Sequence, residues 1–167
     1  MSKVVPSLLA TPACAQECDF LHNLFSESGW EIHQARTFQE VLTAVRGKRI
    51  GVLLSDRRFS DGHCWKDLLE EIQRLESPPM LIVTDRLADE RLWAEVLNLG
   101  GYDLLLKPFD PEELLRVVSS AWASWKFSRD GSTAGGGSAK RPSPEQPKAP
   151  IGDHSPIHGP EGIKSHA

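Results

Sequence analysis

Three side chains of types that can take part in chemical reactions stand at the ends of three separate apolar stretches. Asp56 follows the stretch 50–55, Thr84 ends the stretch 80–84, and Lys107 follows the stretch 103–106. An apolar stretch that ends in a carboxylate is typical of a buried strand that delivers an acidic side chain to the open edge of a parallel sheet. At such an edge, Asp56 can accept a phosphoryl group, or it can form a structural ion pair with Lys107.

The elements that must position these residues are predicted by hydrophobic periodicity. Strands are expected at 7–11, 30–35, 50–55, 80–84 and 103–106, and helices at 15–26, 37–47, 64–75, 89–99 and 110–125. This alternation predicts an α/β fold, in which a five-stranded parallel sheet carries helices on both faces. The ends of the first, third, fourth and fifth strands then meet at one edge, which places Thr11–Ala13, Asp56, Thr84 and Lys107 together.

The composition divides the 167 residues into one domain, 1–127, and a tail, 128–167. The tail is rich in glycine, proline and serine and contains no aromatic residue, so we expect it to be disordered. A formal charge of -4 gives no basic field for nucleic acid. No apolar run is long enough to span a membrane. The faint signal-peptide pattern at 3–15 is rejected because it contains an expected core strand, so we expect a cytoplasmic protein.

The order and spacing of the motifs resemble one known family. Asp56-Arg57-Arg58-Phe59-Ser60-Asp61-Gly62, then Thr84, then Lys107-Pro108-Phe109 are similar to the receiver domain of two-component response regulators over residues 7–125. The resemblance implies a flavodoxin-like, doubly wound (βα)5 fold. It also implies that Asp56 is the phosphoacceptor, that Lys107 contacts the phosphoryl group, and that Thr84 is the switch hydroxyl.

The sequence also departs from the family pattern. The resemblance implies an acidic pair after the first strand that helps Asp56 to hold Mg²⁺, but no carboxylate occurs before Glu17. Asp56 alone should hold the metal poorly, so no cofactor is expected unless phosphorylation is retained. Asp85 follows the switch threonine, where its charge would repel a phosphoryl group, and Leu104 replaces the switch aromatic residue. Tyr102 is a doubtful substitute.

Two functions within this family therefore stay open. The preferred one is an atypical receiver, a pseudo-receiver that lacks the acidic pair and acts as a single-domain regulator or adaptor by docking to proteins. The alternative is a genuine phosphoacceptor that a histidine kinase phosphorylates on Asp56.

Resemblance places the docking face on the fourth helix, fifth strand and fifth helix, and its candidate residues are Trp93, Leu104, Trp122 and Trp125. Partial exposure would let Trp122 or Trp125 anchor a partner, but core packing is the simpler interpretation of each tryptophan taken singly. The expected partner is a histidine kinase or a downstream signalling protein, and the expected state is a monomer or weak dimer.

Functions from other classes fit the sequence less well. A nucleotide- or flavin-binding enzyme needs a glycine loop after the first strand, and the segment 11–15 contains no glycine. No arrangement of serine, cysteine and histidine is typical of a catalytic site, so we do not expect an enzyme. Cys14, Cys18 and His22 share helical spacing, but three residues fall short of a closed metal site. We interpret them as ordinary residues of a helix.

Overall fold

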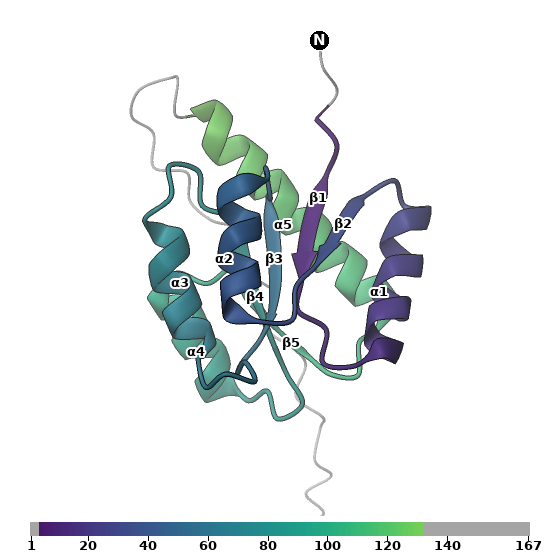
Figure 1. Cartoon of the computed structure of the whole chain (residues 1–167), viewed down its shortest axis with the longest axis vertical. Helices are drawn as coiled ribbons and strands as arrows, with labels where there is room; N and C mark the ends of the chain where they lie inside the picture. Colours follow the sequence, from purple (N-terminus) through teal and green to yellow (C-terminus); the bar gives the residue numbers. More distant parts are fainter. Residues whose placement is uncertain (1–3, 132–167) are drawn as a thin grey trace, which may run out of the picture.

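The computed structural model describes residues 4–131 (Figure 1). Strands and helices alternate along the chain, as the hydrophobic pattern predicts. They are β1 (Ser7–Ala10), α1 (Ala15–Glu27), β2 (Glu31–Gln34), α2 (Phe38–Gly47), β3 (Val52–Asp56), α3 (Trp65–Gln73), β4 (Met80–Asp85), α4 (Glu90–Leu99), β5 (Asp103–Leu106) and α5 (Pro111–Gly131).

The five strands form one parallel sheet in the order β2-β1-β3-β4-β5. β3 lies at the centre between β1 and β4, and its first four residues are fully covered, which explains why its sequence is apolar at successive positions. β2 lies at an edge and is only partly buried, in agreement with its alternating sequence. The predicted α/β fold with a five-stranded parallel sheet is therefore confirmed.

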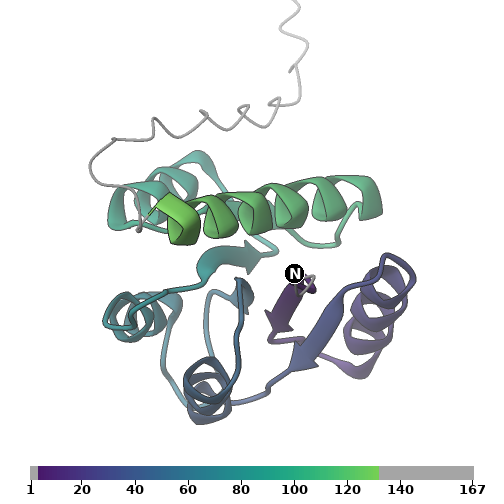
Figure 2. The same ribbon diagram turned by 90° about the horizontal axis from the view of Figure 1, so that it is seen from above.

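Helices cover both faces of the sheet (Figure 2). α1 and α5 pack on one face, where Leu21, Phe25 and Val118 meet the strand residues Leu8 and Leu54. α2, α3 and α4 pack on the other face against the alternate strand residues, among them Leu9, Leu53 and Leu81. Because successive side chains of a strand point to opposite faces, each strand contributes to both halves of the core.

The start of α2 has a capping box. The Glu40 backbone N–H donates to Thr37 Oγ1 at 3.2 Å, and Glu40 Oε2 accepts from the backbone N–H of Thr37 at 3.4 Å. These bonds satisfy amide groups that have no partner within the helix. The cap fixes where α2 begins, and thereby how the chain returns from β2 towards β3.

The expected end of the folded domain is wrong. α5 continues past residue 127 to Gly131, so residues 128–131 belong to the helix and not to a disordered tail. Ser128 Oγ donates to the Ser124 carbonyl, 3.0 Å away, within this last part of the helix. The rest of the predicted tail, 132–167, lies outside the described residues.

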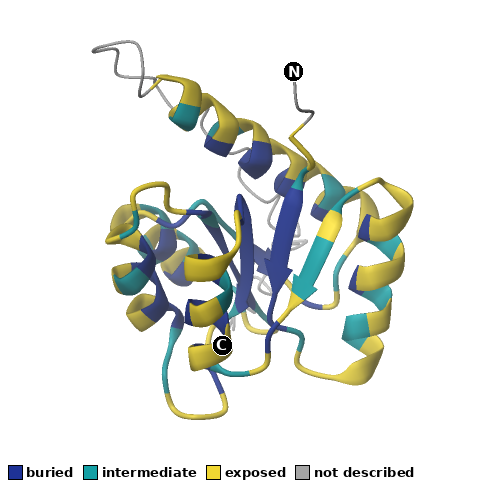
Figure 3. Cartoon of the chain, turned by 45° about the horizontal axis from the view of Figure 1, so that its top comes forward, coloured by how far each residue is buried: buried dark blue, intermediate teal, exposed yellow. Residues whose placement is uncertain are grey.

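Core packing, the simpler interpretation of Trp122 and Trp125, is confirmed, because their side chains are 7% and 2% exposed. Both belong to α5, which is buried along parts of its length (Figure 3). Their rings stack at 4.9 Å, and Trp30 meets Trp122 edge-on at 5.9 Å. The close approach of both rings to Gly51, which has no side chain, lets them lie flat on the start of β3. Neither tryptophan is therefore available to anchor a partner.

Among residues 4–131, no helix combines the length and the apolar character that a membrane crossing requires.

Candidate functional site

Four parallel strands bring the predicted residues to one edge of the sheet, the edge to which the arrowheads point in Figure 1. Asp56 and Thr84 are register partners at the ends of β3 and β4. Thr84 Oγ1 donates to Asp56 Oδ1 at 2.7 Å. From the end of β1, Thr11 Oγ1 accepts a hydrogen bond of 3.0 Å from the Asp56 backbone N–H. The predicted convergence of Thr11, Asp56 and Thr84 is confirmed.

Lys107 completes this cluster from the residue after β5. Its Nζ lies 2.5 Å from Asp56 Oδ1, and its side chain is 7% exposed. The backbone N–H of Lys107 also donates to the Asp85 carbonyl at 3.0 Å, which holds the start of its loop against β4. The ion pair between Lys107 and Asp56, one of the two interpretations of these residues, is therefore present.

Glu17 is a member of the site that the sequence reasoning missed. Its Oε1 lies 2.7 Å from Lys107 Nζ, and its side chain is 13% exposed. Glu17 stands in the first turn of α1, so its carboxylate lies at the same sheet edge that receives the strand ends. The family pattern predicts acids directly after the first strand, whereas Glu17 lies inside the helix that follows. A glutamate one turn into the next helix was the available signal.

The site is an ammonium group clamped between two carboxylates. Lys107 contacts Asp56 and Glu17 at the same time, and both carboxylates are mostly covered. In such a place an ion pair is screened little by water, and removal of the lysine would leave two neighbouring negative charges without a counter-ion. The arrangement therefore holds the Asp56 carboxylate in contact with Lys107.

Asp85 does not present an unpaired charge to the site. Its Oδ2 lies 3.3 Å from Arg57 Nη1, and its Oδ1 accepts from the Leu87 backbone N–H at 3.0 Å. Both contacts draw the carboxylate towards the loops that follow β3 and β4. The repulsion expected from Asp85 is thus partly offset by Arg57.

Neither candidate for the switch position places an aromatic ring beside Thr84. Leu104 is half-buried and packs against the core under α2, α3 and α4. Tyr102 packs on the opposite face, and its hydroxyl lies 2.7 Å from Ser120 Oγ of α5. The tyrosine is therefore tied to α5, away from the side of the sheet that Leu104 occupies.

The oxygen ligands around Asp56 are few. Pro12 and Ala13 occupy the loop after β1 and bring no side-chain oxygen, and Glu17 already contacts Lys107. In the described part of the chain, no group of three His, Cys, Asp or Glu side chains could hold a metal ion. The residues present therefore do not fit the carboxylate-rich octahedral site that Mg²⁺ requires.

The face formed by α4, β5 and α5 combines apolar and polar groups. Leu99 and Leu106 are about half exposed, at 47% and 54%. Trp93 is half-buried, and its Nε1 donates to Asp103 Oδ1 at 3.2 Å. Burial raises the pKa of Asp103, and hydrogen bonds from the Leu104 backbone N–H and from Trp93 offset part of that rise. Of the predicted docking residues, Trp93 and Leu104 lie here and are partly accessible.

Comparisons with known proteins agree with this geometry. The family model for the response regulator receiver domain matches residues 16–119. The transcriptional regulatory protein FixJ of Bradyrhizobium diazoefficiens is 33% identical over 104 residues, which are 62% of this chain and 50% of FixJ. The chain thus spans about half the length of that curated relative.

Solved structures show the same fold. The signal receiver domain of a putative LuxO repressor protein from Vibrio parahaemolyticus superposes with a TM-score of 0.70 at 16% identity, over 80% of this chain and all of that one. Full-length FixJ from B. japonicum gives a TM-score of 0.67 at 24% identity, over 77% of this chain and 63% of that one. The beryllofluoride-activated NtrC4 receiver domain dimer gives 0.65 at 19% identity, over 71% of this chain and 98% of that one.

Proposed function

Because this chain belongs to the response regulator receiver domain family, we propose that it is an atypical receiver that signals in a two-component pathway by docking to other proteins. In this proposal, Asp56 is phosphorylated weakly or not at all. The chain works in the cytoplasm and is no enzyme. Its partner is a histidine kinase or a downstream signalling protein.

One observation carries the proposal: Lys107 Nζ is shared between Asp56 Oδ1 and Glu17 Oε1. An incoming phosphoryl group would need Lys107 for its own negative charge, and Glu17 already competes for that ammonium group. Asp56 Oδ1 is in addition occupied by the Thr84 hydroxyl. The side chains that would receive a phosphoryl group are therefore satisfied by one another.

The oxygen ligands around Asp56 support the same proposal. Receiver domains use Mg²⁺ when they are phosphorylated, because crowded negative charge must be neutralised during phosphoryl transfer. Here Pro12 and Ala13, in the loop after β1, bring no side-chain oxygen, and the carboxylate of Glu17 contacts Lys107. We therefore assign the positive charge at this site to Lys107 and not to a metal ion.

A magnesium titration tests this assignment. Full-length protein is titrated with MgCl₂ at constant ionic strength while tryptophan emission and heat are recorded, with CaCl₂ as a parallel titrant and Asp56→Asn as the matched variant. The proposal expects no saturable response up to about 10 mM, because a single carboxylate with water and carbonyl oxygens binds Mg²⁺ weakly. A saturable response that Asp56→Asn abolishes would contradict it.

The alternative, a phosphoacceptor on Asp56, is favoured by one feature. The Asp56 side chain is 24% exposed, so a phosphoryl donor can reach it, and Thr84 and Lys107 stand within contact distance. For this alternative, Lys107 would have to exchange Glu17 for a phosphoryl oxygen. A protein that is readily phosphorylated on Asp56 would establish that this exchange occurs.

The docking surface in this proposal is the face of α4, β5 and α5. Leu99 and Leu106 are exposed apolar side chains on that face, and Trp93 and Leu104 lie partly accessible beside them. Partly exposed apolar groups of this kind suit the centre of a small protein interface. The proposal describes the protein itself as a monomer or weak dimer.

A further inference from the structure

A polar hollow lies at the edge of the sheet opposite the one that carries Asp56. It measures about 290 Å³ and is bounded by the last residues of α2, the segment before β3, the segment after α3 and the end of α5. Ile50 and Trp125, both buried, form part of its wall. The hollow shares no residue with the Asp56 cluster.

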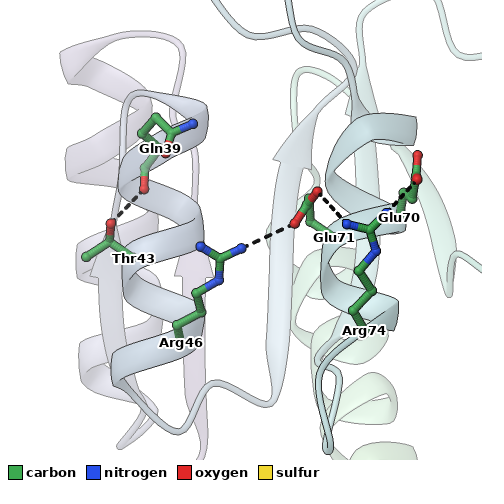
Figure 4. Close-up of polar contacts among 6 residues, drawn as sticks. All are labelled: Gln39, Thr43, Arg46, Glu70, Glu71 and Arg74. Atoms are coloured by element: carbon green, nitrogen blue, oxygen red, sulfur yellow. Dashed lines mark hydrogen bonds and ion pairs between the residues drawn. The ribbon is translucent and has the colours of Figure 1, made fainter.

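The charged residues around this hollow are mostly basic. Arg46, Lys48, Arg49 and Arg129 line it, and Glu76 is the single acidic residue of the lining within residues 4–131. Arg46 is neutralised from outside the hollow, because its Nη2 lies 3.2 Å from Glu71 Oε2 across the gap between α2 and α3 (Figure 4). Lys48 Nζ lies 3.2 Å from His33 Nδ1, and the other ring nitrogen of His33 lies 2.9 Å from Glu31 Oε1.

The two remaining arginines converge on one ring. The guanidinium carbon of Arg129 lies 4.7 Å from the centre of the Trp125 ring, and that of Arg49 lies 5.8 Å from it. Among the described residues, neither guanidinium forms an ion pair with a carboxylate. Two cations held beside the same indole repel each other, so an anion between them would be stabilised by both.

Trp125 contributes a second signal at the same wall. Its side chain is 2% exposed, and its Nε1 is a buried donor without a hydrogen-bond partner in the part of the chain that the structure describes. A buried donor without an acceptor is costly, and native proteins usually satisfy it with water or a ligand. In the hollow itself the donors are the guanidinium groups of Arg49 and Arg129, and the Trp125 N–H is buried below the surface of its wall.

We propose that this hollow binds a small phosphate-bearing molecule, with Arg49 and Arg129 as the groups that hold the phosphate. Guanidinium groups bind phosphate oxygens through paired, charge-assisted hydrogen bonds. These bonds are stronger with a doubly charged phosphate than with a single carboxylate. The volume is at the lower end of the range for small-molecule sites, which suits a phosphate ester up to the size of a mononucleotide. Binding at this hollow is independent of whether Asp56 is phosphorylated.

A titration of the full-length protein with pyrophosphate tests the proposal. Binding is measured by calorimetry and by tryptophan emission, because Trp125 lies beside the expected phosphate. The test variant is Arg49→Gln combined with Arg129→Gln. The matched control is Arg86→Gln combined with Arg91→Gln, which removes the same charge from exposed positions around the start of α4. Circular dichroism and thermal melting check that both variants are folded.

The proposal expects saturable binding that the test variant weakens by about tenfold or more, because two charge-assisted hydrogen-bond donors are lost, and that the control leaves within about twofold. Single Arg129→Lys, which keeps the charge and loses the fork, should bind with intermediate affinity. Equal affinities of the test and control variants would overturn the proposal, as would the absence of saturation. Clearly tighter binding of a phosphoserine peptide than of pyrophosphate would also overturn it in favour of a macromolecular partner.

Discussion

Glu17 and Lys107 form an ion pair of 2.7 Å, although one stands in the first turn of α1 and the other follows β5. The pair connects α1, the first helix of the domain, to the loop that follows β5, the last strand. It also gives Lys107 a second carboxylate besides Asp56. The stability of the domain and the state of Asp56 should therefore depend on Glu17.

Replacement of Glu17 by glutamine should lower the free energy of unfolding by about 1–2 kcal/mol, because a largely covered ion pair is lost while Lys107 keeps Asp56 as a partner. Urea denaturation followed by tryptophan emission measures the change. Glu27→Gln, at the exposed end of the same helix, is the control and should differ little from wild type. Equal effects of the two substitutions would mean that the Glu17 pair contributes nothing.

Replacement of Lys107 by methionine should cost more, about 2–4 kcal/mol, because Asp56 and Glu17 are then left as neighbouring carboxylates without a counter-ion. The same denaturation experiment applies. Addition of Asp56→Asn to Lys107→Met should recover part of the loss, since one of the two negative charges disappears. A double variant that is less stable than Lys107→Met alone would contradict this description of the cluster.

Asp103→Asn should stabilise the protein at neutral pH. Burial raises the pKa of Asp103, so folding favours the protonated carboxyl group. The stability gained from this preference is fully present below the ordinary pKa of 3.8 and is lost as the pH rises through the folded pKa. Asparagine is neutral at every pH and keeps an oxygen for the Trp93 indole and the Leu104 N–H. Urea midpoints as a function of pH should therefore separate above this window and converge below it.

The control for this prediction is Asp19→Asn, which changes an exposed aspartate of α1. Its unfolding free energy should follow the wild-type pH dependence. If Asp103→Asn is less stable than wild type at neutral pH, folding favours the charged form of the carboxylate at position 103, and the pKa of Asp103 is then not raised by burial.

Gly51→Ala should destabilise the domain by about 1–3 kcal/mol. A Cβ atom at this position would lie 2.3 Å from Trp122 Cε3 and 2.9 Å from Trp125 Cε3, so both rings would have to move. Gly47→Ala is the matched control, because no atom lies within 4 Å of its added Cβ, and it should leave stability within about 0.5 kcal/mol. Thermal melting of the two variants gives the comparison, and a loss at Gly47 as large as at Gly51 would contradict it.

The main features of the fold could be predicted because each local pattern agreed with the global arrangement. The uninterrupted apolar run before Asp56 predicted a central strand, and β3 is central. Parallel strands end at the same edge, so the order of Asp56, Thr84 and Lys107 was enough to predict their meeting. The helix starts at Thr37 and Asp110 followed from side chains that cap free amides.

The missing parts depended on three-dimensional relationships that spacing alone does not contain. Glu17 joins the site because α1 begins close to the sheet edge, which the sequence did not specify. The sequence pattern left the exposure of Trp122 and Trp125 open, because their packing depends on Gly51, a residue far away in the sequence. The helix was predicted to end too early because the glycine-rich segment after residue 131 also lowered the expected order of residues 128–131, which α5 includes.

Intact-mass spectrometry decides whether Asp56, which contacts Lys107 and Thr84, is an inefficient phosphoacceptor, as we propose. Full-length protein is incubated with acetyl phosphate and Mg²⁺ and analysed at intervals, beside Asp56→Asn and a receiver domain that is known to be phosphorylated. We expect no species with the added mass of one phosphoryl group while the reference protein is modified. Nearly complete modification of the wild type that is absent from Asp56→Asn would contradict the proposal.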